Sequence, residues 1–338
     1  MRLFATLATL ALLAGCADTV TSSGPAAEEP RFIADAIITT DNVRLPLRQW
    51  LPDGRPNAIV LCVHGFNDYG NAFVRPAKYL TAHGIAVYAY DQRGFGAAPD
   101  TGKWVGQGIL IADLATAAHL LSQKYPGVPL FVLGESMGGA VAMRAMTSAH
   151  PPKVAGLILA APAVWSRARM NVFERVGLWV GSHALPWLPV NGKGLDIWPS
   201  DNIEMLRELS RDPLVIKDTK IGTLEGLVDL MDAAYASAPT LKGPALILYG
   251  EHDEIVPPEP SYDVMATLEG RAGIVRAVYP NGYHMLLRDL QADTVAADIL
   301  SWIEAPTKPL PSGADHRAIE VLADRHPKPI AAAAKAPG

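Results

Sequence analysis

The sequence Gly-Glu-Ser-Met-Gly places Ser136 between Gly134 and Gly138, in the spacing G-x-S-x-G. The apolar run at 130–133 predicts a short buried strand, and the small and apolar residues from Gly138 onward predict a packed helix. Between two such elements, small flanking residues permit a sharp turn that holds a strained and exposed serine. We therefore predict that Ser136 is a nucleophile, and the alternative is an ordinary serine in a glycine-rich turn.

A serine hydroxyl attacks efficiently only when a base removes its proton, and an acid must orient that base and stabilise its cation. In chains with this turn, the order along the sequence is serine, then acid, then histidine. Asp253 and His284 each follow directly after a predicted strand, where their side chains would reach the carboxyl edge of a parallel sheet. We predict Asp253 as the acid and His284 as the base, with Glu251 and Glu254 as less favoured acids.

The tetrahedral intermediate of such a reaction carries an oxyanion, and backbone amides can stabilise it. The amide of Met137, directly after the nucleophile, is one candidate donor, and the amide of Phe66, in the loop after the first central strand, is the other. In the same loop, His64 is predicted to make structural hydrogen bonds. Asp91 and Arg93 follow the next strand and are predicted to stabilise their loop rather than to catalyse.

Composition and spacing argue against several other functions. The net charge of −5 and the lack of a basic cluster exclude the electrostatic footprint of a nucleic-acid-binding protein. The acidic run at 251–254 contains ligand-like residues, but neighbouring side chains point in different directions and no paired cysteines or H-E-x-x-H motif accompany them. We therefore expect no metal site, no dinucleotide or other cofactor, and no nucleic-acid partner.

Strands and helices alternate over most of the 338 residues, of which 49% are hydrophobic and 19% charged. Residues 32–40 and 43–50 predict a hairpin, and the apolar runs after it predict a mostly parallel sheet with helices on both faces. This α/β core is predicted over 32–162 and 239–304. Between them, 163–238 contain four of the seven tryptophans and no convincing strand, which predicts a helical cap over the carboxyl edge of the sheet.

The amino terminus predicts export and a lipid anchor. Residues 1–15 combine an early arginine with an uncharged run too short to span a bilayer, as in a signal peptide. The end of this run, Leu-Ala-Gly-Cys, resembles the lipobox of bacterial lipoprotein precursors, in which the cysteine, here Cys16, is acylated. A secretory peptide with an incidental cysteine is the alternative.

Residues 16–31 are small and polar and fit a flexible tether. Cys62, inside an apolar strand, is predicted to be a buried small hydrophobe.

The lipobox predicts an exported protein that is anchored to a membrane of the bacterial cell envelope, on its periplasmic face or at the cell surface. At the other end of the chain, 305–338 contain six prolines and a run of alanines. We expect this tail to be mostly disordered, with a short helix near 315–324.

Five motifs taken together resemble the monoacylglycerol lipase and lysophospholipase group of the α/β-hydrolases. They are VHGF at 63, DQRGFG at 91, GESMGG at 134, GEHDEIVP at 250 and NGYH at 281. The resemblance spans 32–303 and implies an α/β-hydrolase fold with Ser136 as nucleophile, Asp253 as acid, His284 as base, and oxyanion amides from Phe66 and Met137. It also implies that the cap is the mobile lid of such lipases. Many bacterial and animal members have histidine where this chain has a glutamate before the nucleophile, a variant that resembles plant members.

The motifs favour a membrane-anchored serine hydrolase of carboxylic esters, most readily of a monoacylglycerol or a lysophospholipid. The tryptophan-rich cap supports a lipid substrate, although tryptophans can equally form the cap's own small core. Alternatives on the same fold are an esterase of small soluble substrates, a thioesterase or an aminopeptidase, because a fold does not fix its reaction. A non-catalytic lipid-binding lipoprotein is the alternative from another class.

Overall fold

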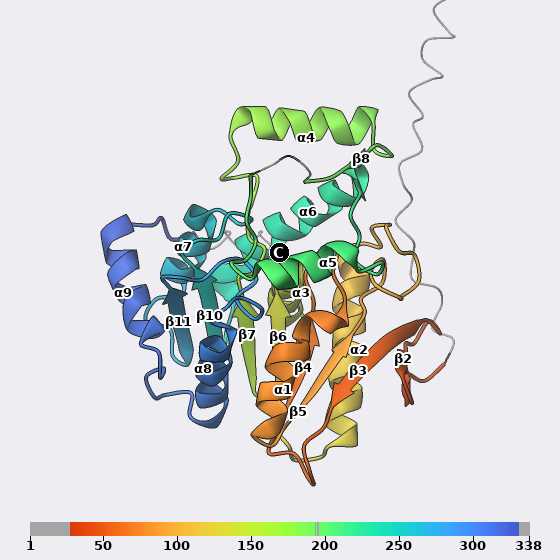
Figure 1. The fold of residues 1–338 in the computed structure, drawn as a ribbon, viewed down its shortest axis with the longest axis vertical. Coiled ribbons are helices and arrows are strands. Elements are labelled where there is room, and N and C mark those ends of the chain that lie inside the picture. Colours follow the sequence, from red (N-terminus) through yellow and green to blue (C-terminus); the bar gives the residue numbers. More distant parts are fainter. Residues whose placement is uncertain (1–27, 193, 195, 331–338) are drawn as a thin grey trace, which may run out of the picture.

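The computed structural model describes residues 28–330 apart from 193 and 195. The predicted signal peptide, Cys16, most of the tether and the last eight residues of the tail lie outside the described residues. Within them, the chain folds around one long sheet with helices on both faces (Figure 1). No helix in this part of the chain is long and apolar enough to cross a bilayer.

The sheet has nine strands in the order β1-β2-β3-β5-β4-β6-β7-β10-β11. The first three pair antiparallel, β3 pairs antiparallel with β5, and every later pairing is parallel, so the predicted hairpin and mostly parallel sheet are confirmed. The strands are β1 (Arg31–Ile33), β2 (Ala36–Ile38), β3 (Arg44–Trp50), β4 (Ala58–Val63), β5 (Ile85–Tyr90), β6 (Leu130–Glu135), β7 (Gly156–Ala160), β10 (Ala245–Gly250) and β11 (Ile274–Tyr279).

The central strands are apolar along their whole length because helices cover both faces of the sheet. In β4, for example, Ile59 and Leu61 face one hydrophobic cluster, whereas Val60 and Cys62 face the other. Helices α1 and α8 bury their apolar residues in the second cluster, and α2, α3 and α7 bury theirs in the first. The helices of this core are α1 (Val74–Ala82), α2 (Gln107–Lys124), α3 (Met137–Met146), α7 (Pro258–Thr267) and α8 (Ala292–Glu304).

The segment predicted as a helical cap lies above the carboxyl ends of the parallel strands (Figure 1). It contains α4 (Val172–Ala184), α5 (Ile203–Arg211) and α6 (Ile221–Ser237). It also contains a small antiparallel ribbon of β8 (Pro189–Val190) and β9 (Thr219–Lys220), which the sequence did not indicate because two-residue strands carry no readable alternation. At its base, the Arg167 side chain bonds the carboxylates of Asp229 and Asp232 on α6.

The short helix expected near 315–324 is present, but the expectation that the rest of the tail is mostly disordered is wrong for its described part, 305–330. Residues Ala314–Arg325 form α9, which packs beside β11 and buries Ala318, Val321 and Leu322. The amide of Lys328 then donates to the buried carboxylate of Asp263 at 2.9 Å. The prolines before and after α9 gave the segment a disordered composition, but the apolar residues between them repeat at helical spacing and cover the edge of the sheet.

Replacing Ala318 by aspartate tests whether α9 is part of the folded protein. Ala318 is fully buried, so an aspartate there would place an unpaired charge in the core, and we expect the free energy of unfolding in urea to fall by about 2 kcal/mol or more. The control is Ile319→Asp, because Ile319 is the next residue of the helix and is 57% exposed. Equal stability of the two variants would contradict the packed helix.

Candidate active site

Ser136 lies in the turn between β6 and α3 with φ of 52° and ψ of −117°. A positive φ is uncommon for a residue with a side chain and is maintained only by its surroundings. The turn is tight because its glycines touch neighbouring backbone: a Cβ on Gly134 would lie 2.5 Å from the carbonyl oxygen of Gly138, and a Cβ on Gly138 would collide with the carbonyl of Val63. The predicted strand, turn and helix are therefore all present, and the turn presents Ser136 at the carboxyl edge of the sheet.

His284 and Asp253 form a buried pair at the same edge. The Nδ1 atom of His284 lies 2.8 Å from Oδ2 of Asp253, and the other carboxylate oxygen accepts hydrogen bonds from the amides of Ile255 and Val256 at 2.8 and 2.9 Å. Burial disfavours the imidazolium, but the negative charge of Asp253 and its hydrogen bond outweigh burial, so the pKa of His284 is raised. The fixed carboxylate can therefore orient the ring and stabilise its cation.

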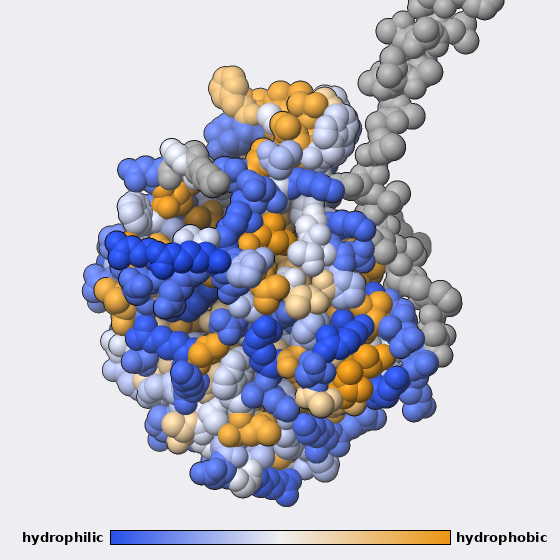
Figure 2. Space-filling view, turned by 45° about the vertical axis from the view of Figure 1, so that its right-hand side comes forward, coloured by the Kyte–Doolittle hydropathy of each residue, from blue (hydrophilic) through white to orange (hydrophobic). Residues whose placement is uncertain are grey.

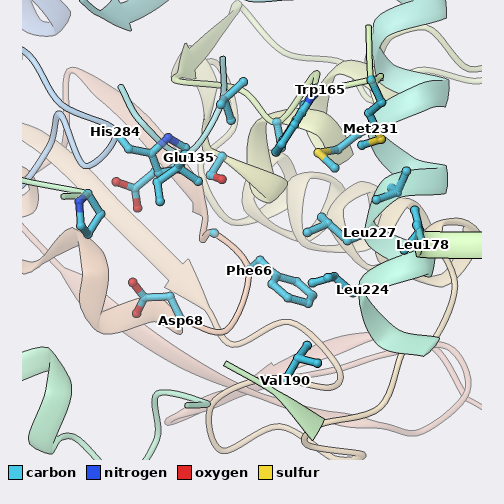
Figure 3. Close-up of a pocket in the computed structure, with 18 of the residues that line it drawn as sticks. Phe66, Asp68, Glu135, Trp165, Leu178, Val190, Leu224, Leu227, Met231 and His284 are labelled. Carbon is cyan, nitrogen blue, oxygen red and sulfur yellow. The ribbon is translucent and has the colours of Figure 1, made fainter. Parts of the chain in front are cut away.

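Ser136 and His284 line one cavity of about 720 Å³ beneath the cap. Phe66 lies on its wall as well, and most of the remaining wall is apolar and comes from α4, α6 and the segment that precedes them (Figure 3). These apolar side chains include Trp165, Leu178, Leu224, Leu227 and Met231. The structure thus places the predicted nucleophile and base on the wall of the same, largely apolar cavity, with the predicted acid bonded to the base.

The two predicted oxyanion donors flank the nucleophile. The turn between β6 and α3 that holds Ser136 is called the nucleophile elbow below. Gly65 approaches it so closely that a Cβ on Gly65 would lie 3.4 Å from Cβ of Ser136, which brings the loop of Phe66, called the oxyanion loop below, beside the serine. Within the described residues, the amides of Phe66 and Met137 donate no hydrogen bond. Both amides are therefore available to an oxyanion, although Met137 itself is buried as the first residue of α3.

His64 holds this loop, as predicted. Its Nε2 accepts a hydrogen bond from the amide of Gln92 at 2.9 Å, so its proton is on Nδ1, which lies 2.8 Å from the carbonyl oxygen of Gly65. Burial lowers the pKa of His64, which keeps the ring neutral. Because the carbonyl and the amide of one peptide point in opposite directions, fixing the Gly65 carbonyl also fixes the direction of the Phe66 amide.

Asp91 and Arg93 stabilise their loop, also as predicted. Asp91 is fully buried and accepts from the amides of Gly70 and Ala97 at 2.9 and 3.0 Å. Arg93 bridges two carboxylates, those of Asp41 and Asp113, outside the cavity. In the acidic run at 251–254, Glu251 pairs with Arg317 and Glu254 accepts from the amide of Trp198, so the two side chains serve separate contacts. No group of three or more potential metal ligands occurs among the described residues.

A buried polar cluster beside the nucleophile was not expected as a unit. It consists of Asp68, Glu135 and Arg288, and we call it the Arg288 cluster. The guanidinium of Arg288 lies 2.7 Å from Oδ2 of Asp68 and 3.2 Å from Oε2 of Glu135. Burial raises the pKa of Glu135, and the positive charge of Arg288 opposes part of that rise. The sequence signalled Glu135 as a departure from the histidine of many relatives, but nothing in it paired Glu135 with residues 67 and 153 positions away.

The sheet order, the strained serine turn and the cap above it define an α/β-hydrolase. The model of the family described as serine aminopeptidase, S33, matches residues 54–291, and the chain belongs to this family. It is a serine hydrolase of the lipase and esterase type, similar to monoacylglycerol lipases.

Two relatives are similar along nearly their whole length. The chain is 28% identical over 266 residues to the monoacylglycerol lipase of Mycolicibacterium smegmatis, which covers 77% of this chain and 93% of the relative. It is 25% identical over 283 residues to the monoglyceride lipase of Homo sapiens, covering 80% and 90%.

Two solved structures share the fold. The monoacylglycerol lipase of Paleococcus ferrophilus superimposes with a TM-score of 0.65 at 24% identity, over 78% of this chain and 99% of that one. A soluble variant of monoglyceride lipase from Saccharomyces cerevisiae, in complex with a substrate analog, gives 0.67 at 20% identity, over 86% and 98%. These agreements confirm the predicted fold class.

The raised pKa of His284 predicts the pH dependence of ester hydrolysis. A base must be neutral to accept a proton, so kcat/KM should rise with pH through a pKa above the usual value near 6.5. In Asp253→Asn, the carboxylate that raises this pKa is gone. The rise of kcat/KM with pH should therefore move to lower pH, while kcat falls by about 10³-fold or more. The control is Glu251→Gln, whose carboxylate pairs with Arg317. Full activity in Asp253→Asn would rule out Asp253 as the acid.

Proposed function

We propose that this protein hydrolyses the ester bond of monoacylglycerols, with Ser136 as nucleophile, His284 as base and Asp253 as the acid that orients it. The observation that carries the proposal is that Ser136 and His284, which is paired with the buried Asp253, line one large apolar cavity. Such a cavity suits one acyl chain, because removing apolar surface from water is favourable by about 25 cal/mol per Å². The similarity to monoacylglycerol lipases along most of the chain supports the same substrate class.

The proposed reaction has two halves. In the first, Oγ of Ser136 attacks the ester carbonyl while His284 takes its proton, and the amides of Phe66 and Met137 stabilise the oxyanion. Collapse of this intermediate breaks the bond to the alcohol, which leaves with the proton from His284, and the acyl group stays on Ser136. In the second half, water gives a proton to His284 and attacks the acyl-enzyme. The bond between the acyl carbon and Oγ of Ser136 then breaks, His284 returns the proton to Oγ, and the fatty acid leaves.

The charges on the cavity wall favour an uncharged alcohol over a phosphate-bearing one. Of the described residues that line the cavity, the acids are Asp68, Glu135 and Glu174, and the arginine is Arg288. Arg288 is already paired with two of these carboxylates. A lysophospholipid headgroup would therefore meet carboxylates rather than a free cation, whereas a glycerol hydroxyl can donate to them.

A substrate panel with Ser136→Ala tests this proposal. We expect turnover of a monoacylglycerol to fall by about 10⁴-fold or more and labelling by a fluorophosphonate to disappear, because the nucleophile is lost. The control is Ser122→Ala on α2, whose hydroxyl bonds a carbonyl of its own helix.

The panel presents one acyl chain as monoacylglycerol, lysophospholipid and thioester, together with a short dissolved ester and an aminoacyl amide. Undiminished turnover in Ser136→Ala would exclude the triad. Preference for the thioester, the short ester or the amide would indicate instead a thioesterase, an esterase of small soluble substrates or an aminopeptidase, respectively. Binding of lipid without any labelling of the wild type would indicate a non-catalytic protein.

The same proposal places the enzyme at a lipid surface. Val172, Phe173, Val176 and Trp179 form an exposed apolar face of α4, and Phe173 is 85% exposed. Figure 2 shows apolar side chains gathered at this top end of the molecule. The opposite side of α4 contributes Leu178 to the cavity wall. A lipid surface is the occupant we propose for the outer face, because aromatic side chains on an amphipathic helix suit the membrane interface and Cys16 is the proposed lipid anchor.

Removing the two attachments separately tests the location. We expect Cys16→Ala to abolish incorporation of labelled fatty acid and to release the protein from the membrane fraction. In this released form, Phe173→Ser with Trp179→Ser should reduce binding to phospholipid vesicles and lower the ratio of turnover on emulsified to dissolved ester. Ile319→Ser, which removes an exposed apolar side chain of α9, is the control. A wild type that is membrane-bound but not acylated would refute the anchor, and an unchanged ratio would refute the α4 contact.

A further inference from the structure

The Arg288 cluster joins three separate parts of the proposed active site. Arg288 lies four residues after His284, in the turn that its own amide closes on the carbonyl of Met285 at 2.8 Å. Its two carboxylate partners belong to the other two parts: Glu135 directly precedes Ser136, and Asp68 lies two residues after Phe66. One guanidinium thus connects the turn after the base, the nucleophile elbow and the oxyanion loop.

We propose that Arg288 is a positioning residue that holds the oxyanion loop and the nucleophile in register with His284, through its bonds to Asp68 and Glu135. This inference rests on the proposed hydrolysis at Ser136 and adds a residue to the serine, acid, histidine and oxyanion donors. Arg288 acts through its partners and takes no part in bond making or breaking.

The geometry of the oxyanion loop shows how a bond to Asp68 is transmitted to Phe66. The amide of Asp68 donates to the carbonyl of Gly65, which closes a turn with Phe66 inside it. Oδ1 of Asp68 accepts from the amide of Tyr69 at 2.8 Å, and Oδ2 accepts from Arg288 at 2.7 Å, so the side chain is fixed at both oxygens. A displacement of the Asp68 carboxylate would therefore turn the peptide that carries the Phe66 amide.

The elbow side of the cluster depends on Arg288 alone. Glu135 is 2% exposed, its Oε2 bonds Arg288, and its Oε1 has no hydrogen-bond partner among the described residues. Without the guanidinium, this carboxylate and that of Asp68 would be buried without a cation, which is costly. A planar guanidinium can bond two carboxylates at once in fixed directions, whereas the ammonium of a lysine is a point charge on a flexible stem.

The cluster also acts on His284 through charge, which provides an independent readout. The charged groups that act on His284 are Asp253 and Glu135, which raise its pKa, and Arg288, which lowers it. Removing the positive charge should move the rise of kcat/KM to higher pH, and removing the charge of Glu135 should move it to lower pH. Loss of geometry alone would lower kcat without moving this rise.

The test compares Arg288→Met, Arg288→Lys, Glu135→Gln and Asp68→Asn, with the double variant Arg288→Met/Glu135→Gln. Kinetics on a dissolved short ester and the rate of fluorophosphonate labelling are measured per folded molecule. We expect kcat of Arg288→Met to fall by about 10²-fold, the cost of a misplacement near 1 Å, with KM changed less than threefold. The rise of kcat/KM with pH should move to higher pH. Asp68→Asn should lower kcat with a smaller shift.

Arg288→Lys separates geometry from charge. It restores the positive charge, so the rise of kcat/KM with pH should return to its wild-type position. A lysine cannot bridge both carboxylates, so kcat should remain about tenfold below that of the wild type. In the double variant, the pH rise should also return toward that of the wild type. The matched control is Arg93→Met, because Arg93 is another buried arginine between two carboxylates but lies outside the cavity. It should lose stability and keep the wild-type pH profile.

Two results would overturn the proposal. One is a wild-type kcat and pH profile in folded Arg288→Met, and the other is a full rescue of kcat by Arg288→Lys. If Arg288→Met does not fold, Arg288→Lys, Glu135→Gln and Asp68→Asn still decide between the outcomes. The labelling rate reports the positions of Ser136 and His284 whatever the substrate is. An ester-inactive wild type whose labelling depends on Arg288 would therefore refute the proposed function and leave this inference standing.

Discussion

The strained turn at Ser136 is the constraint on which the rest of the structure depends. A φ of 52° at a serine costs of order 1–3 kcal/mol, and only a surrounding structure that permits no relaxation can maintain it. The sheet provides this confinement: the amide of Ser136 donates to the carbonyl of Ala160 at the end of β7, and the carbonyl of Ser136 accepts from Ala163. The apolar strands and the glycine contacts therefore hold the backbone of this one residue in an unfavourable conformation.

The buried charges of the site follow from the same arrangement. The turn brings Glu135 below the surface beside the nucleophile, and a buried carboxylate is costly unless a cation neutralises it. Arg288 supplies that cation, and its guanidinium also bonds a second carboxylate, that of Asp68. The His284–Asp253 pair meets the same requirement with a hydrogen bond and two backbone amides. Because these side chains are buried, their interactions are stronger than in solvent, so each fixes geometry as well as charge.

Sequence patterns identified the elements whose information is local. The strand predicted at 130–133 lies within β6, and Ser136, Asp253 and His284 became candidates because each follows a strand that is recognisable by its own apolar run. The Arg288 cluster could not be found in this way. Asp68 lies 67 positions before Glu135 and Arg288 lies 153 positions after it, and only the folded sheet brings the three together. The tail was misjudged for a different reason: the short helix expected near 315–324 is present as α9, but the prolines around it dominated the composition and hid the packing of this helix against the sheet.

The cap connects the chemistry to the outer surface through the two sides of one helix. Of the residues of α4, Ser182 is buried, and the others are half-buried or exposed, so few buried contacts hold this helix to the rest of the molecule. Elements with few buried contacts are those that open at low free energy. Because Leu178 on the inner side lines the cavity and Phe173 on the outer side faces away from it, a lipid surface that binds the outer side would act directly on the cavity wall. Contact with lipid and entry of the acyl chain would then be coupled through the position of α4, to the extent that lipid binds one position of this helix more tightly than another.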